Sequence, residues 1–303
     1  MTAQATTLLA SLSDELANAV AAAARSAVTV NGRRRMPATG IVWNPDGLIV
    51  TASHVVERDE DITVDLPDGR TVPATLVGRD TGTDLALLST GLTDLTPATR
   101  STQEPRVGHL ALAIGRPGPS GPMASFGAIS TVGGAWRTPR GATVDGYIRA
   151  DVAMLPGFSG GPLVDGAGAV IGLNSSTLGR GGGLTIPGKA IDEIVAALQS
   201  YGRVRRGYIG IGTQQVCLSD AQLEMLGRDD CHALLIVQIE DGSPADRDGI
   251  LLGDILLGVA GAPTPNVEAL QDQLPGDRAG QPLDLQVLRG GHPVTVTTTP
   301  ADR

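Results

Sequence analysis

The stretch Pro156-Gly157-Phe158-Ser159-Gly160-Gly161-Pro162-Leu163 places a serine inside a glycine-rich turn. Glycine adopts backbone conformations that other residues avoid, so several N–H groups of such a turn can converge on one point. A serine that attacks a carbonyl group needs these donors, because negative charge develops on the carbonyl oxygen. We expect Gly157 and Ser159 to supply these oxyanion-hole N–H groups. A Ser-Gly-Gly-Pro run alone is more often a structural turn, so its meaning depends on the rest of the chain.

Two upstream segments supply the partners that a nucleophilic serine requires. Thr51-Ala52-Ser53-His54 ends in a histidine, and Thr83-Asp84-Leu85-Ala86-Leu87-Leu88 carries an aspartate before an apolar run. An imidazole must accept the serine proton, and a buried carboxylate must fix the tautomer of the imidazole. Taken singly, the histidine is more simply a half-buried side chain and the aspartate a cap. Together, in the order His, Asp, Ser, they indicate a triad with His54 as base, Asp84 as orienting acid and Ser159 as nucleophile.

Further stretches add to these segments, and together they carry a resemblance to a known family. They are Thr51–Val56, Val77–Asp80 running into Thr83–Leu88, Val107–Gly115, Gly157–Leu163, Val170–Asn174 and Tyr201–Ile211. The chain resembles an HtrA-type serine protease with one C-terminal PDZ domain, from about Val28 to Thr299. The resemblance implies a mainly β fold, in which a chymotrypsin-like double β-barrel is followed by a small α+β PDZ domain. It implies the same three triad roles for the same residues.

Two residues depart from the pattern of that family. Phe158 stands directly before the nucleophile, and Arg116 follows Ala-Ile-Gly, where relatives usually carry Asn at both positions. An amide braces a turn by hydrogen bonding, whereas Phe braces it only by packing. We therefore expect a poorly formed oxyanion hole in the resting state and low or conditional activity.

The composition agrees with this fold class and limits the functions. A chain of 303 residues is long enough for two domains, and its 41 glycines and 20 prolines separate many short Val- and Thr-rich segments. A net charge of −9 argues against general nucleic-acid binding. The 2 cysteines, Cys217 and Cys231, lack the spacing of a zinc site, and two reduced thiols are our expectation, with a disulfide as the alternative. We expect neither a metal nor an organic cofactor.

The pattern of apolar segments predicts three regions. Residues 1–35 would form a helical segment, over residues 7–26, and an entry strand; residues 36–203 the double-barrel protease domain; and residues 207–303 the PDZ domain. In the protease domain we expect one barrel to carry His54 and Asp84 and the other Ser159. The strands predicted there are 41–43, 48–51, 61–66, 71–77, 85–89, 110–114, 126–132, 147–150, 170–175 and 184–187. The active site would then lie in the cleft between the two barrels.

Several finer features follow from the same residues and the resemblance. Ala153 would stand uncharged at the base of the substrate pocket with Met154, Leu184 and Ile186 as walls, which favours a small or medium aliphatic side chain before the scissile bond; core positions are the alternative for Met154 and Ile186. Residues Tyr208, Ile209, Gly210 and Ile211 would form the loop that receives a peptide C-terminus, with a plain edge strand as the alternative.

The overall prediction is a serine endopeptidase that hydrolyses unfolded or misfolded protein, with the PDZ domain binding peptide segments or C-termini. The alternative is a catalytically impaired peptide-binding scaffold or holdase. The resemblance suggests a homotrimer, although the N-terminal region lacks the aromatic residues that relatives use to associate. No signal or membrane-spanning segment stands out in the sequence, which predicts a cytoplasmic protein, whereas HtrA relatives mostly work outside the cytoplasm.

Overall fold

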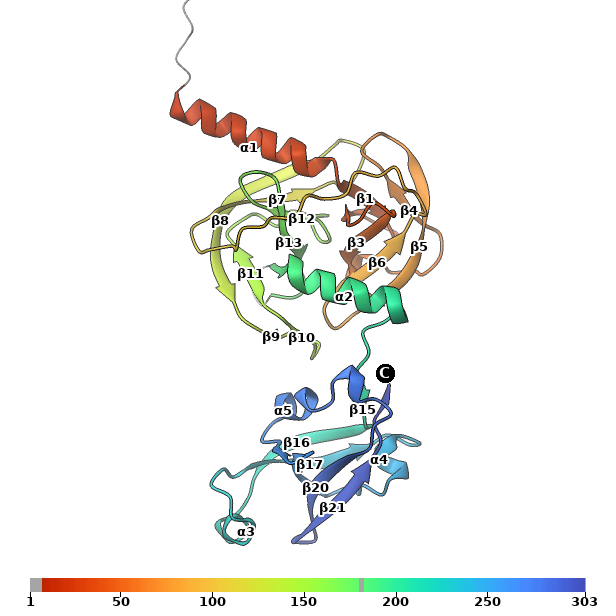
Figure 1. Cartoon of the computed structure of the whole chain (residues 1–303), viewed down its shortest axis with the longest axis vertical. Coiled ribbons are helices and arrows are strands. Elements are labelled where there is room, and N and C mark those ends of the chain that lie inside the picture. The colour runs from red at the N-terminus through yellow and green to blue at the C-terminus, as the bar shows by residue number, and fades with distance from the viewer. Residues whose placement is uncertain (1–6, 180–182, 303) are drawn as a thin grey trace, which may run out of the picture. The chain divides into compact units, whose positions relative to one another are not determined.

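The computed structural model describes residues 7–179 and 183–302, and the chain divides into two units, Met1–Val204 and Arg205–Arg303. Within the described part of the first unit, two closed barrels of six antiparallel strands are formed. This confirms the mainly β double-barrel prediction (Figure 1). The order of the strands around the first barrel is β1-β2-β3-β6-β5-β4, and around the second β11-β14-β13-β12-β7-β8.

The first barrel includes a strand that precedes residue 36. Residues Ala27–Asn31 form β1, which pairs with both β2 and β4 and so closes the barrel. Its apolar side chains are buried because Ala27 packs in the layer shared by the barrels and Val28 and Val30 in the core of the first barrel. The other strands are β2 (Ala38–Val42), β3 (Leu48–Ala52), β4 (Ile62–Asp65), β5 (Thr71–Asp80) and β6 (Leu85–Ser89). A single 3-10 turn, η1 (Ser53–Val55), follows β3.

The second barrel carries the glycine-rich turn between two of its strands. That turn lies between β11 (Tyr147–Ala150) and β12 (Pro162–Val164). The remaining barrel strands are β7 (Leu110–Gly115), β8 (Met123–Gly133), β13 (Val170–Ser175) and β14 (Leu184–Pro187), and β9 (Trp136–Arg137) pairs with β10 (Thr143–Val144) outside the barrel.

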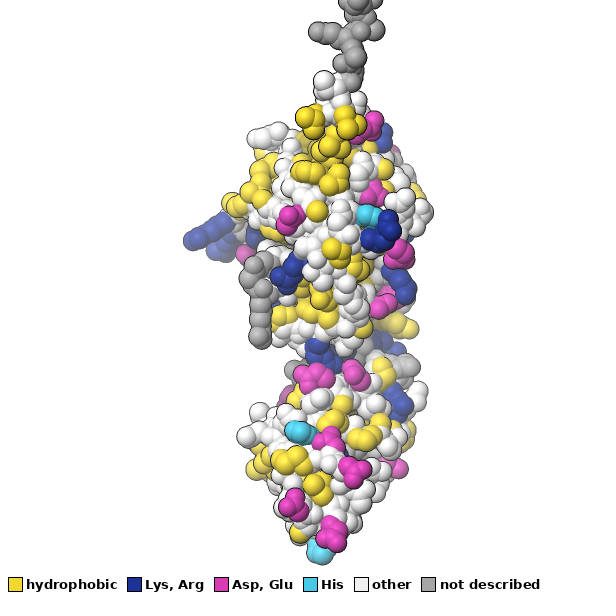
Figure 2. All heavy atoms as spheres, turned by 90° about the vertical axis from the view of Figure 1, so that its left-hand side faces the viewer, with side chains coloured by type: hydrophobic (Ala, Val, Ile, Leu, Met, Phe, Trp, Pro, Cys, Tyr) yellow, Lys and Arg dark blue, Asp and Glu magenta, His cyan; other side chains and the backbone are white. Residues whose placement is uncertain are grey.

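Two helices pack on the barrels. Helix α1 (Leu8–Ala24) begins at the N-cap Thr7 and buries Ala19 and Ala23, while its first turns expose apolar side chains that form the upper surface in Figure 2. Helix α2 (Gly188–Tyr201) ends at Gly202, whose φ of 70° is the left-handed conformation that favours glycine. Apolar side chains of both barrels and both helices share one core cluster, so the barrels are fixed against each other by a common apolar layer.

The second unit is a small α+β domain around one sheet. Its strand order is β16-β17-β18-β20-β21, so β16 is an edge strand, and β15 pairs separately with β22. The elements are β15 (Gly207–Tyr208), β16 (Ile211–Cys217), α3 (Asp220–Leu226), β17 (His232–Ile239), α4 (Pro244–Arg247), β18 (Ile255–Val259), β19 (Ala262–Pro263), α5 (Val267–Asp272), η2 (Gly276–Arg278), β20 (Leu283–Arg289), β21 (His292–Thr298) and β22 (Ala301–Asp302). Ser219 and Gln222 form a capping box at the start of α3.

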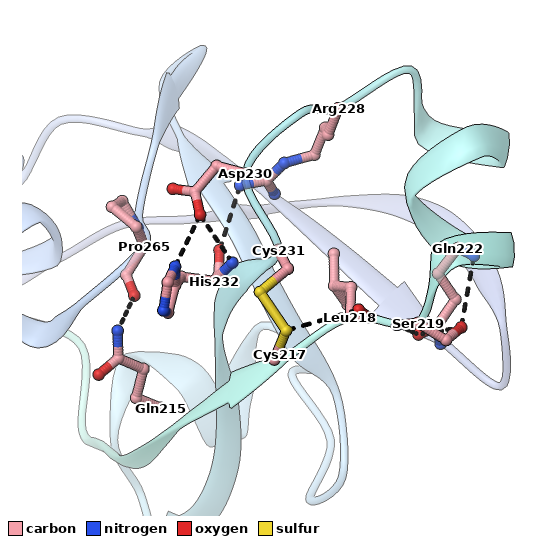
Figure 3. Close-up of a disulfide and its surroundings, with 10 residues drawn as sticks. All are labelled: Gln215, Cys217, Leu218, Ser219, Gln222, Arg228, Asp230, Cys231, His232 and Pro265. Carbon is pink, nitrogen blue, oxygen red and sulfur yellow. Dashed lines mark hydrogen bonds and ion pairs between the residues drawn. A yellow bond between two sulfur atoms is a disulfide. The ribbon is translucent and has the colours of Figure 1, made fainter.

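The expectation of two reduced thiols is wrong. Cys217 and Cys231 form a disulfide with an S–S distance of 2.12 Å, which closes the segment that contains α3 (Figure 3). The two cysteines are 14 residues apart in the chain, and antiparallel pairing of β16 with β17 brings them together, since Cys217 lies opposite His232. The sequence alone does not show this register.

No described helix is long and apolar enough to cross a membrane.

Candidate active site

The end of β3 and the start of β6 bring His54 and Asp84 together in the first barrel. His54 lies in η1, directly after β3, and the two strands are paired. The Ser53 N–H donates to the Asp84 carbonyl at 2.9 Å, and the His54 N–H donates to Asp84 Oδ1 at 3.0 Å. The His54 Nδ1 atom lies 2.8 Å from Asp84 Oδ2. The carboxylate thus contacts both the backbone and the ring of His54, and this fixes the imidazole orientation.

Asp84 is fully buried and has an unusual backbone conformation. Its φ is 60°, a left-handed value that is uncommon outside glycine. The second barrel also reaches this side chain, since Ser175 Oγ and Thr177 Oγ1, at the end of β13, both donate to Oδ2. These two hydroxyl groups are site residues that the sequence analysis missed; the only signal was their polarity at the end of an apolar strand.

The environment of Asp84 keeps its carboxylate charged. Burial is the largest single influence and acts to raise the pKa, but the hydrogen bond and charge of His54, together with the Ser175 hydroxyl, outweigh it. The pKa of Asp84 therefore lies below its usual value, and the group is ionised at neutral pH. An ionised, buried acceptor on Nδ1 places the ring proton there and leaves Nε2 as the proton-accepting atom.

The Ser159 hydroxyl has a partner other than His54 in this structure. Ser159 Oγ lies 2.9 Å from Ser176 Oγ and accepts the Ser176 N–H at 3.3 Å. Within residues 7–179 and 183–302 no hydrogen bond joins Ser159 to the His54 ring. The structure therefore joins His54 to Asp84 but not to Ser159, and the nucleophile role of Ser159 stays a prediction; such hydrogen bonds are often long without substrate and shorten in the complex.

The glycine-rich turn is held by hydrogen bonds on most of its peptide groups. Phe158 N–H donates to Leu155 O at 3.1 Å, Gly161 N–H to Phe158 O at 2.9 Å, and Gly160 N–H to Asn174 O at 2.8 Å. The N–H groups of Gly157 and Ser159 donate to no acceptor among the described residues. These two are the donors that the sequence analysis assigned to the oxyanion hole, and this assignment stays a prediction.

Phe158 is packed into the core beneath this turn. Its side chain is 0% exposed and belongs to the core of the second barrel with Ala113, Ile148 and Leu163. A Cβ atom on Gly115 would lie only 2.3 Å from the Phe158 ring, so the glycine at that position provides the space for the ring. The ring therefore fixes the turn by packing, where an Asn would need polar partners.

Arg116 connects the end of β7 to the first barrel and to helix α1. Its N–H donates to Thr39 Oγ1 at 2.8 Å, its carbonyl accepts from Thr29 Oγ1 at 2.7 Å, and its guanidinium donates to Ala24 O at 3.1 Å. Partial burial lowers the pKa of this guanidinium below its usual value.

The four predicted pocket residues lie in different environments. Leu184 and Ile186, on β14, are buried in the apolar layer shared by the barrels. Met154 is half-buried against Gly183, where a Cβ would lie 2.9 Å from Met154 Cγ, and Ala153 is exposed. The assignment of these four residues to a substrate pocket stays a prediction.

The loop between β15 and β16 has the features of a peptide-binding edge. The carbonyl groups of Ile209 and Gly210 accept from Ala245 and Glu240, at 2.8 and 2.9 Å, which fixes the loop. Gly210 has a φ of 81°, and a Cβ there would lie 2.2 Å from Ser243 Cβ. In the described part of the chain, the N–H groups of Ile209 and Gly210 have no backbone acceptor.

The cluster Asp230, Cys231 and His232 offers three ligand-type atoms within 4.8 Å of one another. Its cysteine is in the disulfide, and Asp230 Oδ1 lies 2.7 Å from His232 Nδ1 (Figure 3). We assign no metal to it.

Comparisons with known proteins agree with both units. A family of trypsin-like peptidase domains matches residues 38–173, and a family of PDZ domains matches residues 207–299. A probable periplasmic serine endoprotease, DegP-like, from Halomonas elongata is 37% identical over 276 residues, which cover 89% of this chain and 57% of that protein. The serine endoprotease DegS of Salmonella typhimurium is 31% identical over 271 residues, which cover 86% of this chain and 75% of that protein.

Solved structures give the same result over nearly the whole chain. The HtrA-type protease AlgW with a decapeptide has a TM-score of 0.76 at 29% identity, covering 95% of this chain and 98% of that one. A serine endoprotease from Yersinia pestis has a TM-score of 0.76 at 30% identity, with the same coverage. The chain spans just over half the length of its DegP-like relatives. With the double barrel, the His54–Asp84 pair and the edge-strand domain, these likenesses show that the chain belongs to the HtrA-type serine endoproteases, with a trypsin-like peptidase domain followed by a PDZ domain.

Proposed function

We propose that this chain is a serine endopeptidase that cleaves unfolded or misfolded protein through His54, Asp84 and Ser159. The observation that carries the proposal is the buried Asp84 carboxylate 2.8 Å from His54 Nδ1, which leaves Nε2 as the base. Membership of the endoprotease family supports the reaction class.

The proposed mechanism assigns one task to each group. The Ser159 hydroxyl leaves Ser176 and gives its proton to His54 Nε2 as its oxygen attacks the substrate carbonyl. Asp84 stabilises the imidazolium and stays ionised. The N–H groups of Gly157 and Ser159 bind the oxygen of the tetrahedral intermediate, and each such donor contributes roughly 3–4 kcal/mol in comparable sites. His54 then protonates the amine as the C–N bond breaks, which leaves the acyl group on Ser159 as an ester. Water gives a proton to His54 and attacks this ester, and the carboxylic acid and the free Ser159 hydroxyl are released.

A fluorophosphonate probe tests this proposal directly, because it forms a bond only with an activated serine. We expect labelling of the full chain and hydrolysis of casein, and loss of both in Ser159→Ala. The matched control is Ser176→Ala, which removes a neighbouring hydroxyl outside the triad and should still be labelled. An unlabelled wild-type chain that nevertheless binds unfolded protein would support the scaffold or holdase instead, and casein turnover that survives Ser159→Ala would end the triad assignment.

We also propose that the residues predicted from the sequence form the substrate pocket and the peptide-binding loop. With the uncharged Ala153 at its base and Met154, Leu184 and Ile186 as its walls, the pocket would take aliphatic side chains. The loop Tyr208–Ile211, at the start of the edge strand β16, would receive a peptide C-terminus by strand addition. The family resemblance is the only support for a homotrimer, and light scattering of the full chain would measure its oligomeric state.

We further propose that the protein works in an oxidising compartment outside the cytoplasm. The disulfide between Cys217 and Cys231 supports this, because such bonds persist mainly in oxidising environments. The name of the relative from Halomonas elongata describes that protein as periplasmic. A cytoplasmic location stays the prediction from the sequence alone, and fractionation of cells that express the chain distinguishes the two.

A further inference from the structure

One threonine of the first barrel is bonded to the serine turn of the second. Thr39 lies on β2 and is 0% exposed. Its Oγ1 donates to the Gly157 carbonyl at 2.7 Å and accepts the Arg116 N–H at 2.8 Å. The Thr39 hydroxyl therefore donates its proton to the serine turn and accepts a hydrogen bond from the residue that follows β7.

The backbone of the same residue holds the other side of the nucleophile. Thr39 N–H donates to the Ser159 carbonyl at 3.3 Å, and the Thr39 carbonyl accepts from Thr51 Oγ1 at 2.7 Å. The carbonyl groups of Gly157 and Ser159, on the two sides of Phe158, are thus both fixed by Thr39.

Peptide planarity explains what this bond controls. The peptide group between Gly157 and Phe158 is planar, and both its ends are held: the carbonyl by Thr39 and the N–H by Leu155. Gly157 has a φ of 86°, and glycine rotates about its backbone bonds at little steric cost. Without the Thr39 hydroxyl, only the Phe158 N–H bond to Leu155 and the packing of the Phe158 ring would orient this peptide group. A rotated carbonyl would put a negative dipole near the place where substrate charge develops.

We propose that Thr39 is a positioning residue for the oxyanion hole. Its hydroxyl fixes the 157–158 peptide group and its N–H fixes the 159–160 peptide group. These adjoin the two peptide groups that carry the Gly157 and Ser159 N–H donors, and so limit how far either donor can turn from the substrate oxygen. This inference rests on the proposed peptidase function. The partners are 118 residues apart in the chain, so the sequence did not show the link.

The test separates a positioning role from a merely structural one. Thr39→Val keeps the shape and removes the hydroxyl, and Thr39→Ser restores it. The matched control is Thr29→Val, which removes another buried barrel hydroxyl that donates to a backbone carbonyl, that of Arg116 at 2.7 Å, but does not contact the turn. For each full-length variant, kcat and KM for a chromogenic peptide, Ki for the matching peptide aldehyde, and Tm are measured. The aldehyde forms a tetrahedral adduct, so its affinity reports on the oxyanion hole.

We expect kcat of Thr39→Val to fall about 10- to 100-fold with KM nearly unchanged, since loss of a whole oxyanion donor costs about 100- to 1000-fold. Affinity for the aldehyde should fall by the same factor as kcat/KM. Thr39→Ser should recover kcat to within about threefold. Thr29→Val should lower Tm while keeping kcat.

Three results would overturn the inference. The first is a folded Thr39→Val variant with wild-type kcat and aldehyde affinity while the wild type reacts with fluorophosphonate. The second is a loss of kcat in Thr29→Val equal to that in Thr39→Val, which would show a general effect on stability. If Thr39→Val does not fold, Thr39→Ala replaces it. The third result that would overturn the inference is then equal kcat and aldehyde affinity in Thr39→Ala and Thr39→Ser. A wild-type chain inert to both probe and peptide instead overturns the proposed function, and this inference with it.

Discussion

Replacing Phe158 by Asn decides how the serine turn is braced. The family resemblance, which implies Asn directly before the nucleophile, suggests that Asn would repair the oxyanion hole and raise kcat. The structure predicts the opposite, because the Phe158 ring is 0% exposed and fills the space above Gly115. We therefore expect Phe158→Asn to be both less stable and slower.

The magnitude follows from two costs. Removing a buried Phe ring from a core costs about 3–5 kcal/mol. The Asn amide would be left among Ala113, Ile148 and Leu163, and an unsatisfied buried polar group costs about 1–3 kcal/mol more. The sum, about 4–8 kcal/mol, is a large part of the roughly 5–15 kcal/mol that stabilises a domain. At about 2–4 °C per kcal/mol for a unit of this size, Tm should fall by about 8–32 °C.

The chain offers a matched control, because its 2 Phe residues lie in contrasting environments. Phe126 is 50% exposed on β8, so Phe126→Asn should change stability by no more than about 0.5 kcal/mol. Thermal melts and peptide kinetics of both full-length variants give the answer. A Phe158→Asn variant with an unchanged Tm and a higher kcat would refute the packing argument and restore the hydrogen-bonded brace.

Four further predictions concern both units. Digests should show cuts after Val, Ala or Ile more often than after Lys or Arg, and mass spectrometry showing mostly basic residues before the cut would contradict the uncharged pocket. A peptide with a free apolar C-terminus should bind the full-length Ser159→Ala chain more tightly than its amidated form, and equal affinities by calorimetry would exclude carboxylate capture. Replacing both Cys217 and Cys231 by Ser should lower the unfolding free energy of the second unit by about 3 kcal/mol, seen in denaturant melts; a reduced wild type as stable as the oxidised one would disprove it. Burial acts to raise the pKa of Asp254, but its hydrogen bonds and ion pair with Arg289 outweigh burial and lower the pKa. The pair therefore stabilises the fold above the ordinary Asp pKa of about 3.9, and this contribution is lost as the pH falls below that value. Arg289→Met should lower Tm at pH 7 and reduce the difference in Tm between pH 7 and pH 3, and an unchanged difference would count against the pairing.

The sequence by itself determined what depends on neighbouring residues. Short apolar runs located strands such as 85–89 and 170–175, because a strand buried on both faces carries apolar residues in succession. The glycine-rich turn around Ser159 was recognisable because turns depend on a few adjacent residues. The chain order His, Asp, Ser and the family resemblance then named the candidate triad and the mainly β fold.

The tertiary structure alone decided the contacts between distant segments. Ser175 lies 91 residues from Asp84 and Thr39 lies 118 residues from Gly157, and only the packing of the two barrels brings each pair within hydrogen-bond distance. Strand register likewise joined Cys217 to Cys231. Phe158 differed from the family pattern in sequence, and its role as a packing brace depended on the space above Gly115. Single residues do not encode such contacts, because each arises from the arrangement of several strands at once.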